Sequence, residues 1–302
     1  MTQAFYQRLL PPPQNWLYQK FLQAVIYPSV WVAGAIASLV PFVQTTLGLP
    51  FSWAAVALIF AAALLPYNLD RVADSFVQKI PDRQAQSFFR QPGVLLILLA
   101  AAIATGILLY QAPIAVRWVS LAGLLPLLYG LPLLPLRLGE QWRWYRVKDI
   151  PGAKAWIVCG TIAYAVVAVP LAYAGQPLSG SAVITAMFLL IFVGSNSHAF
   201  DIRDIESDRE KGVSTLPVMV GVGGTRITLT VLNLAALALL ASGWILGWAG
   251  PGAAIAIPLT LITLTYIWTL NPQTPRHAYN IWIDGVLYLP ALLTWMISGL
   301  GS

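Results

Sequence analysis

Long apolar stretches separated by short polar ones dominate the pattern along this chain. A helix needs about 20 mainly apolar residues to cross the hydrocarbon core of a bilayer, and nine stretches approach that length. Pieces rich in proline and glycine, such as LGLP, AGQPLSG and GWAGPG, separate several of them and are typical of tight turns. The pattern predicts nine transmembrane helices in one polytopic domain over residues 1–302, at 22–44, 51–67, 92–110, 114–134, 153–174, 181–200, 223–247, 252–270 and 280–299.

The composition agrees with a membrane protein. Hydrophobic residues make up 58% of the 302 residues and charged residues 9%, and the mean hydropathy is +0.73. Soluble globular proteins have about 25% charged residues, so we expect an all-α integral membrane protein. The single cysteine, Cys159, cannot form an intramolecular disulfide. The N-terminus lacks the apolar core and cleavage site of a signal peptide and is interpreted as a retained cytoplasmic segment.

Basic residues indicate the orientation of the chain in the membrane. Of the 17 lysines and arginines, 16 fall on the same side as the N-terminus, and the other, Arg117, lies within a predicted span. Because such residues collect on the cytoplasmic side, the N-terminus is predicted inside and the C-terminus outside. The net charge of +6 is explained by insertion and by anionic headgroups, without a nucleic-acid partner. Of the 11 carboxylates only Asp284 lies outside the cytoplasmic loops, so the chemistry is expected on that side.

Two acidic pairs end two of the predicted helices. The second helix ends in PYNLDRVADS, where Asp70 and Asp74 form the first motif. The sixth ends in DIRDIESD, where Asp204 and Asp208 have the same spacing and lie 134 residues after their counterparts. The equal offset suggests two related halves, whose motifs face one central cavity open to the cytoplasmic side.

With Asp201, the second pair forms a stripe on its helix, here called the second motif. At 100° per residue these three aspartates lie within about 60° of one another, whereas Arg203 and Glu206 fall near the opposite side and can pair in solvent. Like charges at this spacing repel each other beside a low-dielectric membrane, so the stripe favours a bound cation. Oxygen ligands alone favour a hard divalent ion such as magnesium. The alternative is a solvated helix end.

Basic residues near the acids are candidates for binding phosphate. They lie in the cytoplasmic segments that contain or adjoin the two motifs. The positive-inside rule also places basic residues there, so a phosphate contact and a topological role are alternatives for each. The candidates are Arg83 in IPDR, Lys148 and Lys154 in WYRVKDIPGAK, and Arg209 and Lys211 in DREKG.

Three further polar residues are expected to face the cavity. Ser197 and His198 precede the second motif in IFVGSNSHAFD, where polar side chains of a membrane helix usually line a cavity. Ser197 lies one turn from Asp201, and His198 is a candidate catalytic base with a hydrogen-bonded structural histidine as the alternative. Asp284, in NIWIDGVLY, is costly to bury, so a cavity position is favoured over a role as a first-turn helix acid.

These motifs resemble those of a known family. The pattern D-x-x-D-x-x-x-D-x-x-x-G, formed by Asp201, Asp204, Asp208 and Gly212 and followed by Thr215, is similar to the UbiA-type intramembrane prenyltransferase superfamily. The similarity covers essentially the whole chain, including nine helices and motifs after the second and sixth. In that family the two motifs bind magnesium ions that hold the diphosphate of an allylic prenyl donor.

The resemblance implies roles for individual residues. Two magnesium ions are implied, with Asp70, Asp74, Asp201, Asp204 and Asp208 as their ligands. For the diphosphate, Arg83 stands in the place of the arginine of the family's P-x-R stretch, and Lys148, with Tyr145, in that of a tyrosine-lysine pair before the fifth helix.

Three positions depart from the family's pattern. The asparagine four residues before the first aspartate is Pro66 here, and Asn68 is the nearest substitute for binding the diphosphate. Tyr145 and Lys148 are three rather than four residues apart. Phe200 stands where a lysine often precedes the second motif. These departures affect the first metal and the acceptor.

The resemblance implies a reaction and its partners. We expect transfer of an isoprenoid chain from an allylic prenyl diphosphate to a lipophilic, aromatic acceptor, through ionisation to an allylic cation assisted by magnesium. Membrane lipid is the expected surrounding, with no nucleic acid and no obligatory protein partner. A terpene cyclase using the same metal site is the alternative. A membrane transporter is less favoured, because the outer turns carry no acid.

Overall fold

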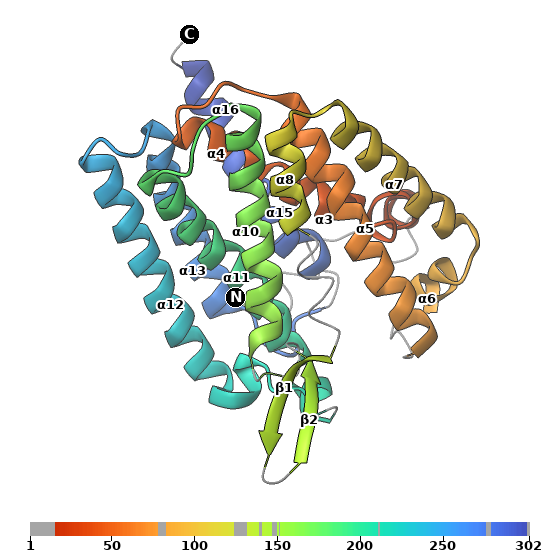
Figure 1. Cartoon of the computed structure of the whole chain (residues 1–302). Coiled ribbons are helices and arrows are strands. Elements are labelled where there is room, and N and C mark those ends of the chain that lie inside the picture. Colours follow the sequence, from red (N-terminus) through yellow and green to blue (C-terminus); the bar gives the residue numbers. More distant parts are fainter. Residues whose placement is uncertain are drawn as a thin grey trace.

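The computed structural model is a bundle of helices with a small hairpin at one end (Figure 1). It describes residues 16–77, 83–123, 132–138, 141–146, 150, 152–210, 212–275 and 279–300. The first elements are α2 (Trp16–Phe21), η1 (Leu22–Ile26), α3 (Val30–Ala37), α4 (Leu39–Thr46), α5 (Trp53–Val77), α6 (Arg83–Phe89), α7 (Gly93–Gln111), α8 (Ile114–Ala122), β1 (Pro132–Leu138) and β2 (Gln141–Arg146). The others are α10 (Ala153–Tyr173), α11 (Gly180–Glu210), α12 (Leu216–Ile245), η3 (Pro251–Ile255), α13 (Ala256–Thr269), η4 (Tyr279–Ile283), α15 (Asp284–Val286) and α16 (Leu289–Leu300).

The helices confirm a multi-pass membrane protein. Six segments within the described residues are long and apolar enough to cross a bilayer; they belong to α5, α7, α10, α11, α12 and the η3–α13 pair. A seventh results if the bent pair of residues 16–26 and 30–46 counts as one span, and Ile281–Met296 is a shorter apolar helix. The total of nine spans and the sidedness of the termini remain predictions.

The prediction of one helix over 114–134 is wrong at its end, where residues 132–134 lie in a strand; residues 124–131 are outside the described residues. Helix α8 ends at Ala122, and residues 132–138 form strand β1, which pairs antiparallel with β2 from Pro132↔Arg146 to Leu138↔Gln141. Figure 1 shows this hairpin beyond the end of α10. Pro132 and Pro135 lack the amide hydrogen that a helix needs, whereas the edge of a two-stranded sheet tolerates them. The expectation of an all-α chain therefore holds for the bundle only.

The first predicted span, 22–44, is broken. Residues 16–26 and 30–46 meet at an angle of 60°. Pro28 cannot donate an amide hydrogen, and Ser29 adopts the left-handed region with φ of 59°, so the helical hydrogen bonding stops between η1 and α3. At the break the Pro28 carbonyl accepts a hydrogen bond from the side chain of Asn68 in α5.

Helices α5 and α11 both continue beyond their apolar portions. Hydropathy placed their ends at residues 67 and 200, whereas the helices end at Val77 and Glu210. Both acidic motifs therefore lie within helices, and Pro66 is accommodated inside α5. Apolar content marks only the part of a helix inside the bilayer, and the polar turns that follow need no break in the backbone.

Arginines satisfy the carbonyl groups at three helix ends. Arg90 donates Nε and Nη2 to the Ser75 carbonyl of α5, at 3.3 and 3.0 Å. Arg226 donates to the carbonyls that end α13, and Arg117 to those that end α7. A helix end leaves carbonyls without intrahelical partners, which is costly near lipid. Capping thus explains Arg117, the basic residue that the sequence did not assign to the cytoplasmic side.

Helix α11, which carries the second motif, packs against α10, α12 and α13 (Figure 1). Two buried amides fix it. Asn233 of α12 donates to Ser195 Oγ at 2.7 Å, and Asn196 donates to the Ile283 carbonyl at 2.6 Å. Buried polar groups need partners, so these bonds set the position of α11 relative to α12 and η4.

Candidate active site

The first motif lies on the last turns of α5. Asp70 is exposed, and no described side chain forms a hydrogen bond to its carboxylate. Its neighbour Arg71 is half-buried and donates Nη1 to the Ile26 carbonyl at 3.2 Å. Asp74 lies one turn further along α5, but its side chain is outside the part of the chain that the structure describes.

Asn68 anchors α5 to the break after η1. Its side chain is completely buried, and Nδ2 donates to the carbonyls of Leu64 and Pro28 at 2.8 and 2.9 Å. Its Oδ1 is buried without a hydrogen-bond partner among the described residues. The two amide hydrogens of Asn68 already bond to the backbone carbonyls of Leu64 and Pro28. A hydrogen bond from this amide to the diphosphate, as predicted, would require one of these two bonds to break.

The second motif ends in a glycine turn. Gly212 has φ of 69°, and its amide donates to the Arg209 carbonyl, while the Val213 amide donates to the Asp208 carbonyl at 2.8 Å. This pair of bonds is the Schellman arrangement, which favours glycine because its φ is positive. The turn returns the chain toward the helix, where Thr215 Oγ1 donates to Asp208 Oδ2 at 3.3 Å.

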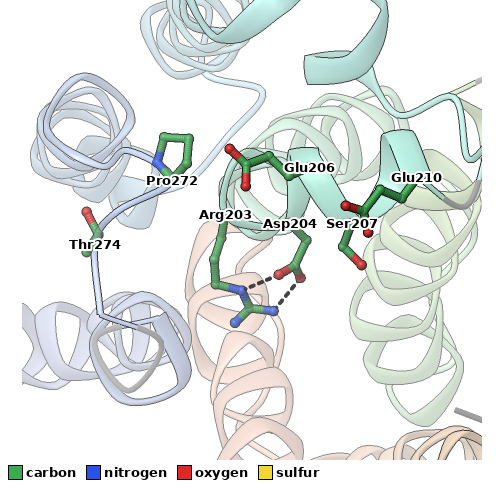
Figure 2. A pocket seen from close by; sticks show the side chains of 7 residues that line it. All are labelled: Arg203, Asp204, Glu206, Ser207, Glu210, Pro272 and Thr274. Atoms are coloured by element: carbon green, nitrogen blue, oxygen red, sulfur yellow. Dashed lines mark hydrogen bonds and ion pairs between the residues drawn. The ribbon is translucent and has the colours of Figure 1, made fainter. Parts of the chain in front are cut away.

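Asp204 is bound by the arginine that precedes it. Arg203 donates Nε to Oδ1 at 2.9 Å and Nη2 to Oδ2 at 2.6 Å, which is a bidentate ion pair (Figure 2). Such charge-assisted pairs are stronger and more directional than ordinary hydrogen bonds. Both residues line a surface pocket of about 330 Å³, together with Glu206, Ser207, Glu210, Pro272 and Thr274.

The expectation that Arg203 pairs in solvent is wrong. Its side chain is only 14% exposed, and its guanidinium lies over the rings of Phe200 and Tyr279, at 4.9 and 5.3 Å from their centroids. The helical wheel placed Arg203 correctly away from the centre of the acidic stripe, but η4 covers that side. Sequence alone gave no signal for this contact, because Tyr279 lies far along the chain.

Asp201 is bound by His198. Nδ1 of His198 lies 2.9 Å from Asp201 Oδ2, and the histidine is 1% exposed with Nε2 lacking a partner among the described residues. The ring packs edgewise against Trp156 of α10, with centroids 5.0 Å apart. Trp156 in turn fits because Gly194 has no side chain, since a Cβ there would lie 2.9 Å from its Cζ3. The structure therefore places His198 between α10 and the second motif.

The two motifs approach each other near Asp284. Asp284 begins α15 and is 9% exposed. Arg71, next to Asp70, and Arg203, next to Asp204, both lie within electrostatic range of Asp284 and of each other. The buried carboxylate thus has two cationic neighbours, one from each motif helix, which reduces the cost of burying its charge.

Ser197 belongs to a cluster of polar side chains on the inward side of the second motif. The side chain of Ser197 lies close to the thiol of Cys159, and Cys159 also lies within electrostatic range of Asp201. Tyr67 of α5 and Tyr266 of α13 lie within electrostatic range of the same cysteine. Four helices therefore contribute polar groups to one region.

Most basic candidates fall where the structure describes no side chain. Arg209 is exposed at the end of α11. Arg83 begins α6, Lys154 lies in the first turn of α10 and Tyr145 lies in β2, but their side chains are outside the described ones. Lys148 and Lys211 are outside the described residues altogether. Their contacts with phosphate remain predictions.

The oxygen donors of the second motif fit a hard divalent cation. All three aspartates offer carboxylate oxygens, the ligands that magnesium prefers. A carboxylate has about four acceptor sites, so hydrogen bonds such as those from Arg203 to Asp204 and from Thr215 to Asp208 do not by themselves prevent cation binding. Within the described side chains, no group of three or more His, Cys, Asp or Glu is already gathered as a metal site.

Comparison with known proteins identifies a family for the chain. The sequence model described as the UbiA prenyltransferase family matches residues 25–284, most of the chain. The chain belongs to the UbiA prenyltransferase family. No curated protein matches it.

Solved structures of UbiA homologues share the fold. One from Archaeoglobus fulgidus, bound to GPP and Mg2+, is 13% identical with a TM-score of 0.63, covering 92% of this chain and 99% of that one. An apo UbiA homologue from Aeropyrum pernix K1 is 14% identical with a TM-score of 0.58, covering 88% and 97%. A digeranylgeranylglyceryl phosphate synthase is 14% identical with a TM-score of 0.56, covering 93% and 97%.

Proposed function

We propose that this chain transfers an isoprenoid chain from an allylic prenyl diphosphate to a lipophilic, aromatic acceptor in a magnesium-dependent reaction. The observation that carries the proposal is the approach of the two acidic motifs, because Arg71 beside Asp70 and Arg203 beside Asp204 are within electrostatic range of each other. Membership of the UbiA prenyltransferase family supports it. UbiA homologues from Archaeoglobus fulgidus have been determined with GPP or DMAPP together with Mg2+.

The role of the chain's own residues is electrostatic. Two magnesium ions, when bound, would neutralise the diphosphate as its bond to the allylic carbon breaks. Fixed charges around the leaving group stabilise the transition state more than the ground state. We assign cation binding to Asp70, Asp74, Asp201, Asp204 and Asp208. We assign diphosphate contacts to Asn68, Arg83, Tyr145, Lys148, Lys154, Arg209 and Lys211.

The polar cluster beside the second motif is our candidate for the reacting end of the acceptor. An allylic cation is stabilised by the faces of aromatic rings in surroundings that exclude water. Tyr67 and Tyr266 both lie within electrostatic range of Cys159, which is also within range of Asp201. His198 and Asp284 are the remaining cavity candidates.

We place the reaction on the cytoplasmic side, since the basic residues predict that the motif ends of α5 and α11 face the cytoplasm. A cysteine introduced at Pro177 should then react with a membrane-impermeant reagent added outside intact cells. Labelling of that cysteine only after the cytoplasm is opened would reverse the topology.

Product analysis tests the function. The purified protein is given magnesium with dimethylallyl or geranyl diphosphate, with and without a panel of aromatic acceptors, and products are identified by mass spectrometry. We expect a prenylated acceptor that requires both magnesium and acceptor and disappears with chelator. A cyclic hydrocarbon from the donor alone would identify a terpene cyclase. Flux of magnesium in liposomes without donor turnover would identify a transporter.

A further inference from the structure

We propose that Arg203 is a positioning residue of the second motif, which holds the Asp204 carboxylate so that Asp204 binds its cation through a single oxygen. The inference rests on the proposed function, because it takes Asp204 as a metal ligand. The observation behind it is the bidentate pair of Figure 2, in which both oxygens of Asp204 accept a hydrogen bond from the same guanidinium.

The geometry of this pair restricts how Asp204 can bind a cation. The bonds of 2.9 and 2.6 Å occupy the lone pair on each oxygen that faces Arg203. A chelated cation, bound by both oxygens at once, needs the same space in front of the carboxylate. A carboxylate has about four acceptor sites and the guanidinium takes two of them, so the pair restricts cation binding to one oxygen without preventing it. Magnesium is usually bound through one or two carboxylates in a strict octahedron, which suits this mode.

Arg203 is itself held in place, which a positioning role requires. Its guanidinium lies over Phe200 of α11 and Tyr279 of η4, and only 14% of the side chain is exposed. Tyr279 is completely buried, and its hydroxyl donates to the Asn271 carbonyl at 3.0 Å. The guanidinium of Arg203, which orients Asp204, is therefore held by the Tyr279 ring of η4, and Tyr279 is in turn bonded to the loop after α13. A lysine has neither the planar fork nor the same stacking.

The formal charges favour a positioning role for Arg203 over competition with the cation. The three aspartates of the second motif and Arg203 have formal charges that sum to −2, which one divalent cation neutralises. Arg203 thus lowers the repulsion among the acids while leaving enough charge for the cation. If Arg203 instead competed with the cation for Asp204, its removal would raise the affinity for metal. The two roles predict changes of opposite sign.

The test measures Mn2+ binding to the full-length protein in detergent by electron paramagnetic resonance, with turnover as a second readout. Arg203→Lys should weaken Mn2+ binding about 10- to 100-fold, as the loss of residues that orient metal ligands commonly does. At saturating Mg2+ its kcat should recover most of the wild-type value, because the effect acts through metal affinity. Tyr279→Phe keeps the ring under Arg203 and loses only the hydroxyl bond, so it is the matched control and should stay within about threefold of wild type.

Further variants keep the proposal falsifiable. Phe200→Leu leaves Arg203 in place but weakens its stacking, and should give a smaller loss of Mn2+ affinity than Arg203→Lys; thermal unfolding checks that each variant is folded. Wild-type affinity in Arg203→Lys and Phe200→Leu, or tighter binding in either, would overturn the positioning role. Asp204→Asn separates the two proposals, since unchanged Mn2+ binding in that variant would remove the metal site of the proposed function.

Discussion

The two acidic motifs are alike in spacing and different in how their side chains are held. In the second motif each carboxylate interacts with a described donor side chain, in the pairs His198–Asp201, Arg203–Asp204 and Thr215–Asp208. In the first motif Asp70 is exposed, and no described side chain forms a hydrogen bond to it. Around the first motif the described hydrogen bonds hold the backbone: Asn68 of α5 donates to the Pro28 carbonyl, and Arg90 donates to the Ser75 carbonyl of α5.

This difference divides the site into a preorganised part and an adaptable part. Carboxylates already oriented by donors lose little freedom when a cation binds, whereas an exposed side chain must be ordered at that moment. The second motif therefore supplies a fixed set of oxygens, and Asp70 can adjust to the cation and to the diphosphate.

Loss of one acid in each motif should have the largest effect on turnover. Asp70→Asn and Asp204→Asn keep the shape and remove charge from a site whose work is electrostatic. Each should lower kcat by about two to three decades, roughly 3 kcal/mol or more, and chelator should reproduce the loss in the wild type. Only Asp204→Asn should also lower the stability, by about 1–3 kcal/mol, because it breaks the pair with Arg203.

Thermal unfolding and turnover of the same preparations separate the two motifs. Glu206→Gln is the control, since this exposed acid lies on the same helix and binds no cation in the proposed mechanism. Near wild-type turnover of either aspartate variant at limiting magnesium would mean that the motifs do not share one site. Equal destabilisation by both would remove the contrast between a held and an exposed carboxylate.

Asn68 offers the next test, on the backbone of the first motif. Asn68→Asp has the same shape, but it cannot donate to the Pro28 and Leu64 carbonyls and buries a charge. We expect a loss of about 2–3 kcal/mol in unfolding free energy, with Mn2+ binding at the second motif unchanged in the folded fraction. Asn68→Ala should show most of the same loss. Unaltered melting temperatures with weaker binding of the prenyl diphosphate would instead support a diphosphate contact.

The sequence predicted the helices and the motifs because both signals are local. An apolar run reports burial in lipid wherever it occurs, and aspartates at helical spacing lie on one face whatever surrounds them. The same locality explains the errors. Residues 132–134 end an apolar run that was predicted as a membrane helix, yet they lie in strand β1, and the prolines at 132 and 135 were the local sign of this. The apolar run ends at residue 200 and predicted the end of the membrane span there, whereas helix α11 continues to Glu210.

Side-chain roles at the site were less predictable, since they depend on distant partners. Asn68 is predicted to contact the diphosphate, and nothing local in the sequence indicated that its amide also binds Pro28, 40 residues earlier in the chain. Arg203 was expected in solvent, and the ring of Tyr279 covers it. The pairing of His198 with Asp201 was not predicted but is accessible from sequence, because residues three apart on a helix are neighbours.

Gly194 tests how the second motif is supported from α10. Gly194→Ala places a Cβ 2.9 Å from Trp156, whose ring lies against His198, so the helices must separate or His198 must shift. We expect a loss of about 1–2 kcal/mol in stability and a few-fold weaker Mn2+ binding. Gly160→Ala in α10 is the matched control, because its Cβ would only touch Leu190 at 3.9 Å. Equal behaviour of the two variants would show that Trp156 does not support the His198–Asp201 pair.

Thr215 should give the smallest effect. Thr215→Val preserves the shape and removes only the hydroxyl that donates to Asp208 Oδ2 at 3.3 Å, near the long limit for such a bond. Thr215 is the N-cap residue of α12 but makes no capping hydrogen bond, so the helix start should be unaffected. A bond of this kind contributes about 0.5–1 kcal/mol, which corresponds to a two- to fivefold loss of Mn2+ affinity. Thr215→Ser keeps the hydroxyl and should bind as the wild type does. A loss in Thr215→Val as large as that in Arg203→Lys would show that the donors act as one coupled unit, because the long bond alone is too weak to account for it.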